Sequence, residues 1–230
     1  MSGIGTETER SSLKNLALRT LKASAGLFVF SFGSYLCIPA NVGLSPWTAF
    51  SAGAAHASGL SFGTVSIITS AVILVADWLL KEQLGIATVL DALLVGIFID
   101  FFLYLDLIPQ INSFPAGIAL LLAGQVFISA GSYFYMSPAL GCGPRDSLMI
   151  AISKRAEKLP IGFIRGLIEG TALLIGWMLG AKVGIGTVIS VFGIGFLLQI
   201  TFKIFRFDAN AVRHQNFSQS LKEAFPNLRG

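Results

Sequence analysis

The sequence predicts an all-α membrane protein, a polytopic bundle of six transmembrane helices built as two inverted three-helix repeats. Each repeat carries one additional short half-helix. Three observations lead to this prediction: the composition, six long apolar runs, and an internal repeat. Of the 230 residues, 54% are hydrophobic and only 12% are charged. This composition is typical of integral membrane proteins and excludes an ordinary soluble domain.

The apolar runs are the predicted spans. A helix rises about 1.5 Å per residue, so about 20 apolar residues cross a hydrocarbon layer of about 30 Å. Six runs meet this length: 24–42, 61–80, 85–105, 116–136, 160–180 and 184–205. The flanking segments are a polar N-terminal segment at 1–23, a hinge between the halves at 109–115, and a polar C-terminal tail at 207–230.

The chain repeats itself. A shift of 98 positions (141 minus 43) places the turn Gly43-Leu44-Ser45-Pro46 on Gly141-Cys142-Gly143-Pro144. Beyond one inserted residue near Gly59 the shift is 99, and Trp78 falls on Trp177. The first membrane repeat is therefore 24–108 and the second is 116–206. Because each contains an odd number of spans, the second copy is expected to lie upside down relative to the first.

Each repeat also contains a short helical segment after its Gly-x-x-Pro turn. The segments 47–57 and 144–156 have only about a dozen residues, which is too few to cross a bilayer. We expect each to be a half-helix that re-enters the membrane or lies at its surface.

The positive charges indicate the orientation. Lys and Arg occur in the N-terminal segment, at Lys81, between 145 and 158, and in the tail, whereas Lys182 alone falls on the opposite side. Since basic residues accumulate on cytoplasmic loops, both termini are predicted to be cytoplasmic, in a multi-pass protein of the cell membrane. The net charge of +4 is thus interpreted as a topology signal. We expect the lipid bilayer and a small-molecule solute as partners, no nucleic acid, and leave a homo-oligomer open.

No enzyme motif is present. The sequence contains no GxSxG, HExxH, P-loop or Rossmann glycine pattern, and its two cysteines, Cys37 and Cys142, form no CxxC. We expect no catalytic residue, no metal site and no cofactor.

The paired turns are the first candidates for a substrate path. A proline at the first helical position leaves free N-H groups and a partial positive charge at the helix start, where an anion can bind. The turn residues concerned are Ser45, Pro46, Gly141, Gly143 and Pro144. Matching interrupted segments mark the binding site in transporters with inverted repeats. The alternative is that each turn is only a tight reversal.

Arg145 and Asp146 replace Trp47 and Thr48 of the first repeat. Arg145 can recruit an anionic group of the substrate while Asp146 holds the Arg145 side chain or caps the first turn. Alternatively, the two residues form a solvated pair at the cytoplasmic boundary.

Polar residues at matched depths in the spans complete the predicted path. Arg165 and Glu169, four residues apart on one helical face, correspond to Ser66 and Ser70 in the first repeat. A charge near mid-bilayer costs about 2.5–3.5 kcal/mol on insertion scales, so it should face a partner or a wet cavity. The alternative for this pair is an ion pair that only packs helices.

One further aspartate joins this list. Asp91 corresponds to Ser190, and both are predicted to line the path.

Several motifs resemble one family. The runs Gly43-Leu44-Ser45-Pro46-Trp47, Gly59-Leu60-Ser61-Phe62-Gly63-Thr64, Gly96-Ile97-Phe98-Ile99-Asp100, Gly141-Cys142-Gly143-Pro144-Arg145-Asp146 and Gly184-Ile185-Gly186-Thr187 are similar to the YczE branch of the YczE/YyaS/YitT group of bacterial membrane proteins. The resemblance covers residues 26–202 and implies a location in the bacterial cytoplasmic membrane.

The sequence thus favours a secondary transporter or permease for a small solute, anionic if Arg145 binds it, with a path between two inverted repeats. The alternative is a membrane component that does not itself transport, either the substrate-binding subunit of a larger importer or an accessory protein of a membrane-linked biosynthetic pathway.

Overall fold

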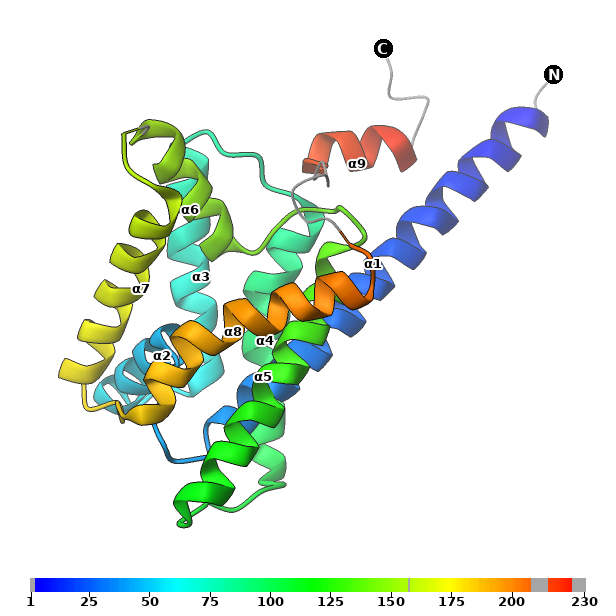
Figure 1. Ribbon diagram of the computed structural model, residues 1–230. Helices are drawn as coiled ribbons and strands as arrows, with labels where there is room; N and C mark the ends of the chain where they lie inside the picture. Colours follow the sequence, from blue (N-terminus) through cyan, green and yellow to red (C-terminus); the bar gives the residue numbers. More distant parts are fainter. Residues whose placement is uncertain (1–2, 157, 208–214, 225–230) are drawn as a thin grey trace.

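The computed structural model describes residues 3–156, 158–207 and 215–224, and every regular element within these ranges is an α-helix (Figure 1). The helices are α1 (Gly3–Cys37), α2 (Pro46–Ser58), α3 (Phe62–Leu79), α4 (Ile86–Leu105), α5 (Phe114–Met136), α6 (Pro144–Arg155), α7 (Ile161–Met178), α8 (Ile185–Ile204) and α9 (Phe217–Ala224). Six of them, α1, α3, α4, α5, α7 and α8, are long and apolar enough to cross a membrane. The prediction of an all-α protein with six long apolar helices is confirmed.

The two short helices begin at the paired turns. Pro46 and Pro144 are the first residues of α2 and α6, and the residue before each proline has an extended backbone. With 13 and 12 residues, these helices are about 20 and 18 Å long, less than the thickness of a hydrocarbon layer. Short helices therefore exist at both predicted positions.

The most extensive helix contact is the crossing of α1 and α5, which lie side by side in Figure 1. A Cβ on Gly131 would lie 2.7 Å from the carbonyl oxygen of Gly26, and a Cβ on Gly33 would lie 2.5 Å from the carbonyl oxygen of Gly124. Small residues let helix backbones approach where lipid supplies no hydrophobic drive. Since the partners follow opposite sequence directions, α1 and α5 are antiparallel.

The short helices pack across the two halves of the sequence. α2 packs mainly on α7, where a Cβ on Gly53 would lie 2.4 Å from the carbonyl oxygen of Gly176. α6 packs mainly on α3. Each half-helix therefore finds its main partner in the other half of the chain.

Backbone hydrogen bonds fix the turns that precede the short helices. The N-H of Gly186, at the start of α8, donates to the carbonyl of Val42 at 2.8 Å. The N-H of Ala87, at the start of α4, donates to the carbonyl of Leu140 at 2.9 Å. Both turns are thus bound to the first turn of a long helix from the opposite half.

The remaining long helices flank this centre unequally. α4 packs on α1 and α8 packs on α5, while α3 and α4 lie along each other. α7 and α8 make few contacts with each other. The second half is consequently the more open one (Figure 1).

The ends of the chain differ from the expected segment boundaries. The polar N-terminal stretch continues the first span as one 35-residue helix, α1, which ends at Cys37. In the tail, α9 docks on this extension through Arg19, which donates to the carbonyl of Pro138 at 2.7 Å and forms an ion pair with Glu223 at 3.3 Å. The rest of the predicted tail segment, 208–214 and 225–230, lies outside the described residues.

Replacing Gly131 by leucine tests the α1–α5 crossing. The new side chain meets main-chain atoms of α1 that cannot move aside. We therefore expect the free energy of unfolding to fall by more than the roughly 1–3 kcal/mol that is typical of overpacking. The measurement is the midpoint of thermal unfolding in detergent. Gly166→Leu on α7 is the matched control, because a Cβ there meets nothing within 4 Å. Equal effects of the two substitutions would show that the crossing is not close-packed.

Candidate functional site

Charged and polar side chains gather where α6 begins. We call Asp91, Tyr135, Arg145 and Asp146, together with the Gly143 backbone, the central cluster. The Tyr135 hydroxyl donates to Asp146 Oδ2 at 3.5 Å. The position of a Cβ on Gly143 lies 3.2 Å from Asp91 Oδ2 and 3.4 Å from the Tyr135 hydroxyl. The cluster thus joins α4, α5 and the N-terminus of α6.

The absence of a side chain at Gly143 allows this approach. The backbone of Gly143 is extended, with φ −61° and ψ 154°, which any residue can adopt. Space is therefore the limiting factor: a methyl group would require Asp91 to move by a few tenths of an ångström and would lie in contact with the Tyr135 hydroxyl. Gly143 lets a carboxylate and a phenol lie against the start of the helix.

Arg145 is the cation of the cluster. Its guanidinium carbon lies 4.6 Å from the centre of the Trp47 ring, and a cation-π contact of this kind contributes about 0.5–2 kcal/mol. Burial lowers the pKa of Arg145, while Asp91 and Asp146 act in the opposite direction. An arginine remains protonated in proteins, so the cluster holds a permanent positive charge.

Asp146 lies in the first turn of α6. A carboxylate at this position is favourable because it faces the positive end of the helix dipole. Asp146 therefore stabilises the start of α6 and also the positive charge of Arg145.

Arg165 and Glu169 form the predicted ion pair on α7. Arg165 Nε and Glu169 Oε1 are 2.8 Å apart, and the side chains are 46% and 21% exposed. Glu169 also contributes to the electrostatic field at Arg145. The two side chains thus pair with each other within one helix, and Glu169 acts on Arg145 only through its charge.

The other predicted path residues lie elsewhere. The Ser45 hydroxyl shares a hydrogen bond with Thr48 at 2.8 Å, and Ser190 accepts a hydrogen bond from the Gln125 amide at 3.2 Å between α5 and α8. Ser66 and Ser70 are buried on α3. The structure thus brings together Asp91, Gly143, Pro144, Arg145 and Asp146, and holds Ser190 in a separate helix contact.

Sequence reasoning missed two members of this region. Tyr135 carried no signal, because the last turn of the fourth span reads as ordinary apolar helix. Trp47 carried one: it is the repeat counterpart of Arg145. The alignment of the two halves of the sequence thus paired two residues that lie in contact in the structure.

A second ionisable group is buried outside the cluster. Asp77 on α3 has no exposed surface, and within the described part of the chain neither carboxylate oxygen has a hydrogen-bond partner. The Ser147 side chain on α6 is the polar group that faces it. An unpaired carboxylate in such a position costs stability.

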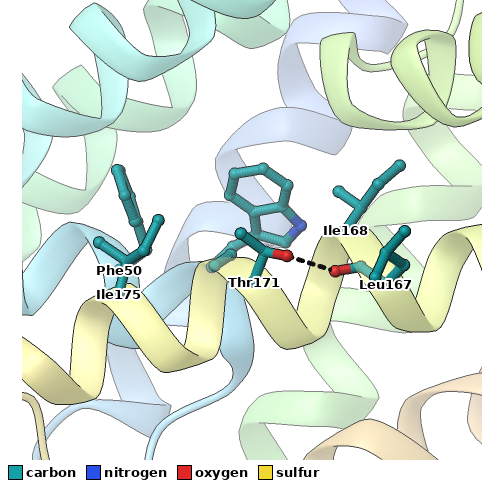
Figure 2. A pocket seen from close by; sticks show the side chains of 7 residues that line it. Phe50, Leu167, Ile168, Thr171 and Ile175 are labelled. Atoms are coloured by element: carbon teal, nitrogen blue, oxygen red, sulfur yellow. Dashed lines mark hydrogen bonds between the residues drawn. The ribbon is translucent and has the colours of Figure 1, made fainter.

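An apolar groove lies between α2 and α7 (Figure 2). Its volume is about 340 Å³, and it is lined by Trp47, Phe50, Leu167, Ile168, Thr171, Ala172 and Ile175. The Thr171 hydroxyl donates to the Leu167 carbonyl at 2.8 Å, as the dashed line in Figure 2 shows. Trp47 borders both this groove and Arg145.

Comparison with known proteins identifies the family. Residues 17–203 match a family described as "Family of unknown function (DUF6198)". The chain belongs to the DUF6198 family.

Three relatives agree with this family assignment. The DUF6198 chain is 33% identical to "Uncharacterized membrane protein YczE" of Bacillus subtilis over 82% of this chain and 87% of that protein. It is 31% identical to an "Uncharacterized protein" of Haemophilus influenzae over 77% and 80% of the two chains, and 28% identical to "Uncharacterized protein YyaS" of B. subtilis over 76% and 88%. No solved structure matches. The resemblance to YczE and YyaS is therefore confirmed, and the chain is a membrane protein.

The thiol of Cys142 tests the environment beside the cluster. Burial, and then the charge of Asp146, raise the pKa of Cys142 to about 12, so the reactive thiolate is scarce at pH 7. With Cys37→Ser, Cys142 is the remaining thiol. We expect maleimide to label it at least tenfold more slowly than it labels the exposed thiol of a Lys158→Cys protein that also carries Cys37→Ser and Cys142→Ser. The labelling rate of Cys142 should increase with pH up to the highest pH that the protein tolerates. Equal rates at pH 7 would contradict this environment.

Replacing Asp77 by asparagine removes the buried charge and keeps the shape of the side chain. We expect the free energy of unfolding to rise by about 1–3 kcal/mol at pH 7, as measured by denaturant unfolding in detergent. Asp106→Asn, at the exposed C-terminal end of α4, should raise it by less, about 0.3–1 kcal/mol, because it removes a negative charge from the negative end of the helix dipole. A destabilised Asp77→Asn protein would reveal a partner for the carboxylate.

Proposed function

We propose that this protein is a secondary transporter of a small anionic solute in the bacterial cytoplasmic membrane, with both termini cytoplasmic and the central cluster as its binding site. The observation that carries the proposal is the Arg145 guanidinium, which lies at the start of a short helix, over the ring of Trp47 and in the electrostatic field of two carboxylates. A helix start and an arginine both favour an anion.

The contacts between the halves support two inverted repeats. The repeat shift of 98 turns the contact of Gly26 with Gly131 into a contact of Gly124 with Gly33, which is the second close contact of the α1–α5 crossing. When each residue of one contact is replaced by its repeat counterpart and the result is again an observed contact, the two halves are related as by a two-fold axis. Since α1 and α5 are antiparallel, an axis in the membrane plane relates them.

The turns support the same symmetry. Val42 and Leu140 are counterparts, as are Ala87 and Gly186, and the hydrogen bonds that join them have nearly equal lengths of 2.8 and 2.9 Å. The counterparts Trp47 and Arg145 lie in contact with each other. The axis then passes close to them, and the N-termini of α2 and α6 meet near the centre of the protein.

The charges suggest how binding is coupled to protons. An anion on Arg145 adds a third negative charge beside Asp91 and Asp146. Uptake of one proton by either carboxylate restores the balance, so the proposed transport is anion-proton symport. Alternating access comes from rocking α7 with α2 against the remaining helices, because α7 makes few contacts with α8.

Uptake into proteoliposomes tests the proposal. With the purified chain as the only protein, we expect accumulation of a small carboxylate or phosphate from a labelled panel, driven by an inward proton gradient. Arg145→Gln should reduce the initial rate at least tenfold and Arg145→Lys less, because lysine keeps the charge but not the planar fork. Lys158→Gln is the exposed control and should behave as the unmodified protein.

The same experiment separates the alternative. If the purified chain binds an anion in an Arg145-dependent way but moves none, it is a substrate-binding or accessory subunit. If no anion binds, the proposed function is wrong.

A further inference from the structure

The groove between α2 and α7 offers a ligand little that is polar. Thr171 uses its hydroxyl on the Leu167 carbonyl of its own helix, and the other polar group among the lining side chains is the indole N-H of Trp47. α7 is one of the six candidate spans, so the groove opens toward the hydrocarbon of the bilayer. In Figure 2 the side chains of α7 and Phe50 stand around it. An aliphatic chain can pack against these apolar side chains, whereas a polar solute would find few hydrogen-bond partners there for its polar groups.

One residue, Trp47, belongs to both the groove and the charged region. Trp47 lines the groove and stacks with Arg145 at 4.6 Å. On α7, Ile168 lines the groove, and the next residue, Glu169, contributes to the field at Arg145. An elongated molecule in the groove therefore has one end beside a permanent cation.

We propose that the solute is a single-chain anionic amphiphile, with its aliphatic chain in the α2–α7 groove and its anionic head on Arg145. This inference rests on the proposed function and specifies its substrate class. The amphiphile enters from the bilayer through the open side of the groove. Trp47 lies between the two parts of the site: it lines the groove that holds the aliphatic chain and contacts the arginine that binds the head.

The energetics divide selectivity between the two parts. Moving a methylene from water to an apolar site contributes about 0.8 kcal/mol, but a chain that arrives from lipid has gained this already. The groove therefore selects by shape, and the discrimination against neutral lipids comes from the head. A neutral molecule of equal chain length should bind markedly less well.

Photolabelling tests the inference on the complete chain in nanodiscs of zwitterionic lipid. The probe is dodecanoate with a diazirine on its terminal carbons, and the adducts are located by mass spectrometry. We expect adducts on Phe50 and within 167–175, at least tenfold fewer with Arg145→Gln, and an intermediate number with Arg145→Lys. The dodecanol analogue with the same diazirine should label these positions at least tenfold less.

Two matched substitutions on α7 test the groove itself. Thr171→Phe fills the groove and should abolish the adducts. Gly170→Phe adds the same ring at a position where a Cβ meets nothing within 4 Å, and should leave them unchanged. Thermal unfolding midpoints equal to that of the unmodified protein establish that each variant is folded. If Thr171→Phe is not folded, Ile168→Phe replaces it; if the control Gly170→Phe is not folded, Gly166→Phe replaces it.

Labelled butyrate distinguishes the failure of this inference from the failure of the proposed function. If butyrate binds in an Arg145-dependent way while dodecanoate labelling is insensitive to Thr171→Phe, the protein handles small anions and the amphiphile proposal is overturned. Equal labelling by the dodecanol analogue overturns it as well. If neither butyrate nor dodecanoate depends on Arg145, both proposals are overturned.

Discussion

The close approach of two backbones at the α1–α5 crossing determines the geometry of the whole bundle. Glycines on both helices bring main-chain atoms into contact, and this leaves no freedom in the distance or register of the pair. α4 packs on α1 and α8 packs on α5, so the positions of four long helices follow from one contact. Because α4 and α5 carry Asp91 and Tyr135, the same contact positions two members of the central cluster. The glycines of the α1–α5 crossing thus help to determine where the central cluster lies.

The cluster then solves the problem of an arginine inside an apolar bundle. A guanidinium needs either water or partners, and here it has the aromatic face of Trp47 on α2 and the charges of Asp91 on α4 and Asp146 on its own helix. Because Trp47 and Asp91 belong to other helices, the charge of Arg145 links α6 to α2 and α4. An anion that binds Arg145 competes with the protein's own carboxylates for this cation. Anion binding can therefore change how the linked helices are positioned.

The sequence contained most of the architecture and part of the site. Long apolar runs, two proline turns and a repeat of 98 residues specify the six long helices and both short ones, because these features depend on local pattern. Arg145, Asp146 and Asp91 could be selected because charges are rare in such runs. Tyr135 and the pairing of Ser190 with Gln125 could not, since they depend on how each helix is rotated about its axis. The burial of Asp77 depends in the same way on the helices that pack on α3, α6 among them.

The crossed attachment of the short helices has a consequence for biosynthesis. α2 leaves the ribosome early, yet its main partner is α7, which is made more than a hundred residues later. α3 likewise waits for α6. The nascent first half therefore sits in the membrane with unfilled contacts until the second half is inserted, and its half-helix depends on the insertion machinery or on lipid for temporary cover. Two separately produced halves would each lack what the other supplies, so a viable split protein requires simultaneous synthesis of both fragments.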